Sequence, residues 1–190
     1  MSARRAAVLV SGSGRTALNL LAASREGRMP AHVAVVVAHR EDIPAVARCR
    51  EAGLSVEIVP GPACGATSDA LDAALLRAGA EIVLLAGYLR MFRVGRWSGR
   101  ALNIHPALLP HFGGPGMHGR RVHEAVLASG ARESGCTVHA VDDQYDHGRI
   151  VAQRRCPVLP ADTPESLAAR VFEQELIAYP DAVALWSARC

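Results

Sequence analysis

The chain contains no lysine, so every residue in its Lys-plus-Arg count of 21 is an arginine. This absence excludes Schiff-base chemistry, the anchoring of pyridoxal phosphate and the lysine of a P-loop, because each of them needs a lysine amine. The net charge is only +3, and the arginines are spread along the 190 residues without the basic stripe typical of nucleic-acid binding. We therefore expect small-molecule substrates and no nucleic-acid partner.

Cysteines are few and the apolar runs are short. The five cysteines are scattered and form no C-x-x-C pair, which argues against a disulfide framework and a zinc knuckle. Cys136 is expected to pack as a small buried hydrophobe. The apolar run near the N-terminus spans about seven residues, too few for a signal peptide or a membrane span. We expect a cytoplasmic protein that does not associate with membranes.

The histidines do not follow a metal-binding pattern either. His118 and His123 lie five residues apart near the start of a predicted helix, whereas metal ligands on one helix face are three or four apart. No carboxylate or cysteine cluster accompanies them. We interpret both as surface histidines and expect no metal.

Short apolar runs alternate with amphipathic stretches, which is typical of a parallel sheet covered by helices on both faces. The predicted strands are 6–12, 32–39, 55–60, 81–87 and 101–105. The predicted helices are 16–25, 43–52, 68–78, 122–129 and 164–187. This order predicts one doubly wound, Rossmann-like α/β domain over residues 1–190.

The pattern changes after residue 100. Two further apolar runs, GCTVHAV (135–141) and RIVAQRRC (149–156), bracket the short segment DDQYDHG (142–148). Strands joined by so short a loop predict an antiparallel pair. A long C-terminal helix follows them.

The first predicted strand leads into the helix through SGSGRTAL, a glycine turn. Backbone N–H groups at a helix start bind anions, so the turn predicts a phosphate site. Gly12, Gly14 and Ala17 also match G-x-G-x-x-A, and Arg40 after the second strand could contact a 2′-phosphate. An NADP-dependent reductase and a non-catalytic nucleotide-binding module therefore stay open as alternatives.

Asn103 and His105 stand in the apolar stretch ALNIHPALLP. They are two apart in a strand, so their side chains share a face, and Pro106 ends the strand where α/β folds bind ligands. An amide and a protonated imidazole can stabilise the oxyanion of an acyl transfer.

A nearby carboxylate would keep that imidazole charged. The segment DDQYDHG offers Asp142, Asp143 and Asp146 as candidates.

The stretch NIHPALLP resembles the N-x-H-P-S-L-L-P signature of folate-dependent formyltransferases. Four more segments match this family in order: VLVSGSGRTALNL, LLAGYLRMF, VHEAVLASGARESGCTVHAVDDQYDHGRIVAQ and FEQELIAYP. The resemblance implies transfer of a formyl group from 10-formyltetrahydrofolate to the amine of glycinamide ribonucleotide in purine (IMP) biosynthesis, without a covalent enzyme intermediate. It places phosphate binding in residues 1–100, and catalysis and folate binding in residues 101–190.

The resemblance also implies residue roles. Asn103 and His105, with His105 kept cationic by Asp146, would stabilise the tetrahedral oxyanion, and Asp146 would help to manage the proton that leaves the amine. Thr137 and His139 would orient this group. Substrate phosphate and ribose contacts fall on Gly14, Arg15, Thr16 and Glu175. Folate contacts fall on Leu89, Arg90, Met91, Phe92, Asn103, Asp142, Asp143, Gln144, Tyr145 and Asp146, with Arg100 as a further candidate.

The chain departs from the family pattern in the glycine loop, at Ala107 and at His147. The family usually reads G-N-G-S-N in the glycine loop, where this chain has Arg15 in place of the serine, and Arg15 could supply charge. Ala107 replaces a serine, and His147 replaces a small residue. Methionyl-tRNA formyltransferase and formyltetrahydrofolate hydrolase share the signature but carry additional domains, so the length of the chain favours neither. We expect a monomer or a homodimer.

Overall fold

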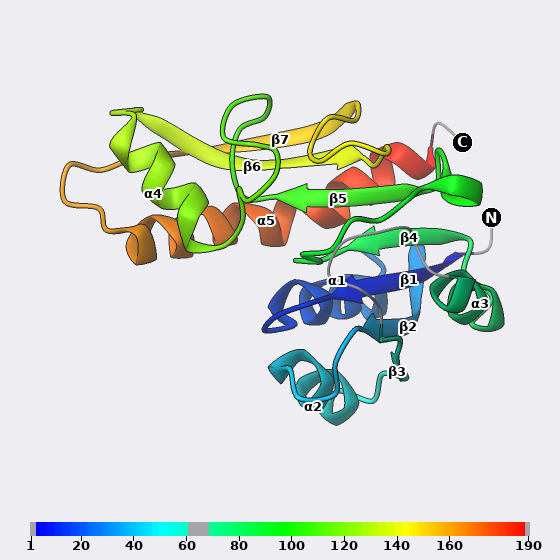
Figure 1. The fold of residues 1–190 in the computed structure, drawn as a ribbon. Helices are drawn as coiled ribbons and strands as arrows, with labels where there is room; N and C mark the ends of the chain where they lie inside the picture. The colour runs from blue at the N-terminus through cyan, green and yellow to red at the C-terminus, as the bar shows by residue number, and fades with distance from the viewer. Residues whose placement is uncertain (1–2, 61–68, 189–190) are drawn as a thin grey trace.

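The computed structural model describes residues 3–60 and 69–188. Its described strands form one sheet in the order β3-β2-β1-β4-β5-β6-β7 (Figure 1). β1 to β5 pair in parallel, while β6 is antiparallel to β5 and β7 is antiparallel to β6. The expected doubly wound sheet with an antiparallel pair near its C-terminal end is thus confirmed.

The helices and strands lie close to their predicted positions. The strands are β1 (Arg4–Val10), β2 (Ala31–Ala38), β3 (Val56–Ile58), β4 (Ile82–Leu85), β5 (Ala101–His105), β6 (Glu133–Ala140) and β7 (Ile150–Pro157). The helices are α1 (Arg15–Arg25), α2 (Pro44–Glu51), α3 (Asp69–Arg77), α4 (Arg120–Ala128) and α5 (Pro164–Ser187), with a 3-10 turn η1 (Gly95–Trp97). The predicted residue 68 of the third helix lies outside the described residues.

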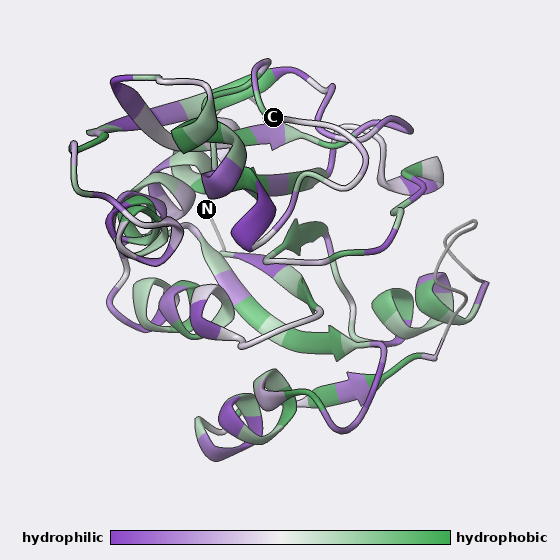
Figure 2. Cartoon of the chain, turned by 60° about the vertical axis from the view of Figure 1, so that its left-hand side comes forward, coloured by the Kyte–Doolittle hydropathy of each residue, from purple (hydrophilic) through white to green (hydrophobic). Residues whose placement is uncertain are grey.

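Both faces of the parallel sheet are buried, which explains why its strands read as nearly continuous apolar runs. Val8 and Leu84 belong to the larger hydrophobic cluster, whereas their neighbours Leu9 and Val83 belong to a second cluster on the opposite face. Figure 2 shows the hydrophobic residues gathered on the strands, with hydrophilic residues concentrated on the helices. The described helices include none that is long and apolar enough to cross a membrane.

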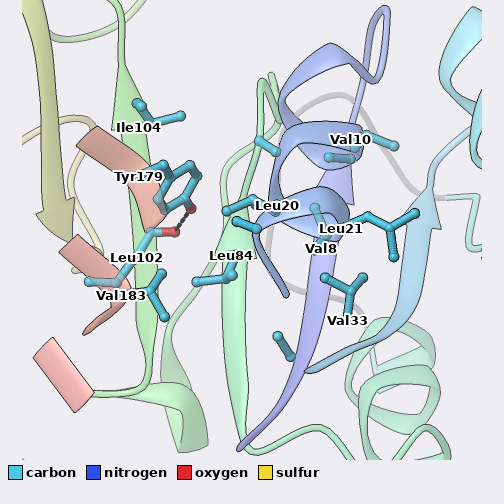
Figure 3. Packing of buried hydrophobic residues seen from close by; sticks show 14 of the residues in the cluster. Val8, Val10, Leu20, Leu21, Val33, Leu84, Leu102, Ile104, Tyr179 and Val183 are labelled. Carbon is cyan, nitrogen blue, oxygen red and sulfur yellow. Dashed lines mark hydrogen bonds between the residues drawn. The ribbon is translucent and has the colours of Figure 1, made fainter. Parts of the chain in front are cut away.

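The long helix α5 packs along β5, β6 and β7 (Figure 1). The hydroxyl of the buried Tyr179 is 3.0 Å from the carbonyl oxygens of Leu85 in β4 and Leu102 in β5. Figure 3 shows the contact with Leu102. One hydroxyl hydrogen serves these two acceptors in turn. The contact ties α5 to the last residue of β4 and to the second residue of β5, immediately before Asn103.

A proline inside α5 creates a second tie. Pro180 has no backbone N–H, so the Leu176 carbonyl loses its helical donor. The side chain of Asn19 in α1 replaces it, with Nδ2 donating to the Leu176 oxygen at 2.9 Å. This hydrogen bond therefore fixes the position of α1 along α5.

The cysteines of the described residues are free and buried, namely Cys49, Cys136 and Cys156. Burial raises the pKa of the Cys136 thiol to about 12. This agrees with its expected role as a packed hydrophobe rather than a nucleophile.

Candidate active site

Asn103 and His105 of β5 line a cavity of about 580 Å³. This volume is within the range of about 300–1,000 Å³ common for ligand pockets. Antiparallel pairing sets Asn103 opposite His139 and His105 opposite Thr137. Residues directly opposite on paired strands bring their side chains together. The imidazoles of His105 and His139 are 3% and 2% exposed.

Asp146 is the carboxylate that joins this group. Its Oδ2 lies 3.3 Å from His105 Nδ1 and accepts a hydrogen bond of 3.0 Å from the Gly114 N–H. Its Oδ1 lies 3.4 Å from Asn103 Nδ2 and 3.5 Å from His139 Nε2. Asp146 therefore contacts Asn103, His105 and His139.

The backbone at Asp146 is strained in order to make these contacts. Its φ is +53°, in the left-handed region, which costs a non-glycine residue free energy and is found mainly at functional sites. Gly113 packs against it so closely that a Cβ there would lie 3.1 Å from Asp146 Cβ and 2.5 Å from Leu109 Cδ2.

The other two candidate aspartates have different roles. Asp142 Oδ2 lies 2.8 Å from His147 Nδ1, and Asp143 accepts a hydrogen bond of 3.1 Å from the Val94 N–H. Both contacts fix the 142–148 loop rather than His105.

Burial lowers the pKa of His105 below its ordinary value, and the charge of Asp146 and the Phe112 carbonyl oppose this shift only in part. Desolvation of the imidazolium thus outweighs its attraction to Asp146, which favours a neutral His105 in the free protein over the cationic ring that the family resemblance implies. His105 Nε2 donates to the Phe112 oxygen at 2.8 Å. Nδ1 then faces Asp146 with a lone pair, ready to take a second proton.

Asp146 itself stays ionised. Burial alone would raise its pKa, but the nearby His139 and His105 rings and the Gly114 N–H outweigh burial and lower it. His139 Nδ1 donates to the Ala140 oxygen at 2.9 Å, which leaves Nε2 to accept from Asn103 Nδ2 at 3.1 Å. One amide hydrogen of Asn103 is thus firmly held, and the other makes only the long contact to Asp146.

Thr137 holds the proline loop instead of an imidazole. Its hydroxyl donates to the Ala107 oxygen at 2.7 Å and accepts from the Leu109 N–H at 3.0 Å. Gln153 of β7 adds hydrogen bonds to Thr137 Oγ1 and to the Leu109 oxygen. The loop that follows His105 is therefore fixed from β6 and β7.

The glycine turn forms another part of the cavity wall. Gly14 caps α1 with a φ of +78°, and a Cβ at this position would lie 2.8 Å from Ala45 Cα. Arg48 Nη1 donates to the Ser13 oxygen at 2.9 Å. Only glycine fits between the turn and α2, and the turn is held rigidly.

Glu175 of α5 faces the same cavity as the glycine turn. Burial raises the pKa of Glu175 to about 7, against a smaller opposing effect of Arg15. Glu175 therefore holds its proton to a higher pH than an ordinary glutamate does.

Most of the predicted ligand-binding residues line this one cavity. They are Arg15, Thr16, Leu89, Arg90, Met91, Phe92, Asn103, His105, His139, Asp142, Gln144, Tyr145, Asp146 and Glu175. Gly14, Thr137 and Asp143 lie behind the wall. Arg100 lies elsewhere, with its guanidinium 5.2 Å from the ring centroid of Trp97.

The residues proposed for a dinucleotide do not converge. Arg40 donates to Asp42 Oδ1 at 2.8 Å and is absent from the cavity wall. Its charge is already paired, so the NADP-dependent reductase loses its 2′-phosphate contact.

Comparison with known proteins shows the family of the chain. The model of the formyl transferase family matches residues 4–183. The chain belongs to this family.

Relatives of the same family agree over nearly the whole chain. Phosphoribosylglycinamide formyltransferase, chloroplastic, of Arabidopsis thaliana is 40% identical over 187 residues, which are 95% of this chain and 64% of the relative. Glycinamide ribonucleotide transformylase 1 of Symbiobacterium toebii superposes with a TM-score of 0.86 at 38% identity, covering 98% of this chain and 88% of that structure. Phosphoribosylglycinamide formyltransferase of Brucella melitensis superposes with a TM-score of 0.86 at 35% identity, covering 97% of this chain and 96% of that structure. The chain thus spans about 64% of the length of the plant relative.

The structure shows how the chain accommodates two of its departures from the family pattern. Ala107 is fully buried, and the loop is held through its carbonyl by Thr137, so no side-chain hydroxyl is needed there. His147 pairs with Asp142 across the base of the 142–148 loop. The His147 imidazole thus joins the two ends of this loop.

The sequence analysis missed several residues of the cavity wall. His123 is the clearest error, because it is 4% exposed and not a surface residue. It shares the buried face of α4 with Val122 and Val126, and the apolar spacing of that helix could have revealed it. His118 is exposed, as expected, although it also lines the cavity. Among the described residues no group of His, Cys, Asp or Glu could hold a metal ion.

Proposed function

We propose that the chain transfers the formyl group of 10-formyltetrahydrofolate to the amine of glycinamide ribonucleotide, giving the N-formyl product and tetrahydrofolate in purine biosynthesis. One observation carries the proposal: Asn103, His105 and Asp146 meet in a cavity that also reaches the glycine turn. The reacting group and an anion-binding turn therefore share one space. The names of the relatives from Arabidopsis thaliana and Symbiobacterium toebii support this substrate pair.

The amine attacks the formyl carbon directly, and the carbonyl oxygen becomes an oxyanion. Asn103 stabilises it with the amide hydrogen that makes only the long contact of 3.4 Å to Asp146. The proton lost by the amine passes to the His105–Asp146 pair, where His105 Nδ1 lies 3.3 Å from the carboxylate. Protonated His105 adds a positive charge near the oxyanion.

Collapse of the tetrahedral intermediate breaks the bond from the formyl carbon to N10 of the folate. N10 leaves with the proton held by His105, which returns to its neutral form. All atoms and charges balance without a covalent enzyme intermediate. These steps start from a neutral His105, whereas the family resemblance implies a ring kept cationic by Asp146, because burial lowers the pKa of His105.

The two substrates occupy opposite parts of the cavity. The phosphate and ribose lie towards Gly14, Arg15, Thr16 and Glu175, at the N-terminus of α1. The folate lies towards Leu89, Met91 and the 142–146 segment, where apolar side chains border backbone amides and carbonyls. We further propose a cytoplasmic location, although the plant relative is named chloroplastic.

A steady-state assay tests the function. Purified protein is mixed with 10-formyltetrahydrofolate, and the absorbance of the folate is followed with and without glycinamide ribonucleotide. Deformylation that requires the ribonucleotide supports transfer, and Asn103→Ala should then abolish most of it. Turnover without the acceptor indicates a hydrolase, and no turnover under either condition contradicts the proposal.

A further inference from the structure

Arg15, one of the positions at which the chain departs from its family, lies against an aromatic ring. The Arg15 guanidinium carbon is 3.7 Å from the ring centroid of Phe172 in α5. Both side chains line the active-site cavity, together with Thr16 and Glu175. The arginine is thus held at the end of the cavity where the proposed function places the phosphate.

An aromatic ring holds an arginine differently from a carboxylate. Stacking uses the flat face of the guanidinium and leaves its five N–H donors at the edge free. In the described part of the chain Arg15 makes no ion pair within 4.0 Å, and Glu175 influences it only through space. The donors of Arg15 therefore remain available to an anion.

The helices that carry the two residues are tied together one turn away. Asn19 follows Arg15 by four residues in α1, and Leu176 follows Phe172 by four residues in α5, so each lies on the same helix face as its partner. The 2.9 Å hydrogen bond between Asn19 and the Leu176 carbonyl fixes the level of one helix against the other. The stacked position of Arg15 is therefore built into the packing of α1 on α5.

From this arrangement we infer that Phe172 is a positioning residue that holds Arg15 ready to bind the phosphate of the ribonucleotide. Free arginine side chains lose considerable rotamer entropy when they bind a ligand. Stacking on Phe172 removes part of that loss beforehand. The inference rests on the proposed function for the identity of the ribonucleotide, and on the geometry alone for phosphate.

Calorimetric binding of ribose 5-phosphate, with ribose as the phosphate-free control, tests the inference independently of catalysis. Arg15→Gln should weaken binding of ribose 5-phosphate by about tenfold or more, because a charge-assisted contact is lost. Phe172→Leu should weaken it by roughly two- to fivefold, the usual value of one exposed cation–π contact. Phe172→Tyr, which keeps the ring, should bind as the wild type does, and no variant should change the response to ribose.

The double variant Arg15→Gln/Phe172→Leu decides whether Phe172 acts through Arg15. We expect it to bind no more weakly than Arg15→Gln alone. Equal losses from Phe172→Leu with and without Arg15, no loss in Phe172→Leu, or no binding of ribose 5-phosphate to the wild type would each overturn the inference. Phe172→Met replaces Phe172→Leu if the latter does not fold.

Kinetics separate positioning from a general structural effect. Phe172→Leu should raise the KM for glycinamide ribonucleotide while kcat and the KM for the folate stay unchanged, and an equal fall of kcat would contradict positioning. If the wild type shows no formyl transfer but the variants bind ribose 5-phosphate as expected, the proposed function fails and the role of Phe172 in positioning Arg15 stands. If the wild type transfers the formyl group but the variants do not bind as expected, the proposed function stands and the role of Phe172 fails.

Discussion

The coupling of His105 and Asp146 can be tested with a double-mutant cycle. The variants are His105→Ala, Asp146→Ala and the double substitution, with Asp146→Asn as an isosteric variant that removes the charge and keeps an oxygen for the Gly114 N–H. We expect each single alanine variant to lose on the order of a hundredfold or more in kcat, and the double variant to lose little further.

The magnitude follows from the geometry. At 3.3 Å and an effective dielectric constant of about 20, a protonated His105 and an ionised Asp146 attract each other by about 5 kcal/mol. In the free protein the cost of desolvating the imidazolium is larger than this attraction, as the lowered pKa of His105 shows. A hundredfold loss in kcat corresponds to about 2.7 kcal/mol. The expected loss therefore requires that roughly half of the attraction between His105 and Asp146 stabilises the transition state.

The assay is the absorbance change of the folate at saturating concentrations of both substrates. Asp146→Asn should lose nearly as much as Asp146→Ala, because the charge and not the hydrogen bond stabilises the imidazolium. Chemical denaturation of each variant controls for loss of folding. If the two losses add in the double variant, the residues act independently and the proposed proton transfer is refuted.

Three further outcomes are expected. Gly14→Ala should raise the KM for glycinamide ribonucleotide by about tenfold or more and leave the KM for the folate nearly unchanged, because its Cβ would lie 2.8 Å from Ala45 Cα at a φ of +78°; equal changes in both KM values would contradict the assignment of the turn. Asn19→Leu should lower the free energy of unfolding in urea by about 1–3 kcal/mol, since the Leu176 carbonyl loses its donor; unchanged stability would show that water replaces the amide. The pKa of Glu175 is raised from 4.5 to about 7, so the folded state binds the proton more tightly and the free energy of unfolding should fall as pH rises from about 4.5 to about 7, by at most about 3 kcal/mol. Glu175→Gln should remove this dependence, and an identical pH profile in that variant would refute its origin in Glu175.

The sequence predicts the sheet well because burial on both faces leaves an unusual signature. Strands such as Ala31–Ala38 are apolar at almost every position, and no amphipathic helix has that pattern. The antiparallel pair was also predictable, since seven residues between two apolar runs leave no room for a crossover helix. The boundary of α4 was less accurate because its first turn, at Arg120, is polar and exposed.

The convergence of Asn103 and His105 follows from strand periodicity, but the choice of Asp146 does not. Asp142, Asp143 and Asp146 are equivalent in the sequence, and only the left-handed backbone of Asp146 turns its carboxylate towards His105. The protonation of His105 was likewise beyond the sequence. It depends on the balance between desolvation and one charge at 3.3 Å, and neither quantity can be read from residue order.

The absence of lysine gives the Arg15–Phe172 contact its meaning. A lysine in the glycine turn would present a compact, strongly hydrated ammonium that no ring could orient for bidentate binding. Arginine has a flat face and a donor edge, so one surface can be held by Phe172 at 3.7 Å while the other stays free. In a chain whose basic side chains are all arginines, an aromatic partner on a neighbouring helix is therefore an effective way to fix a cation without neutralising it.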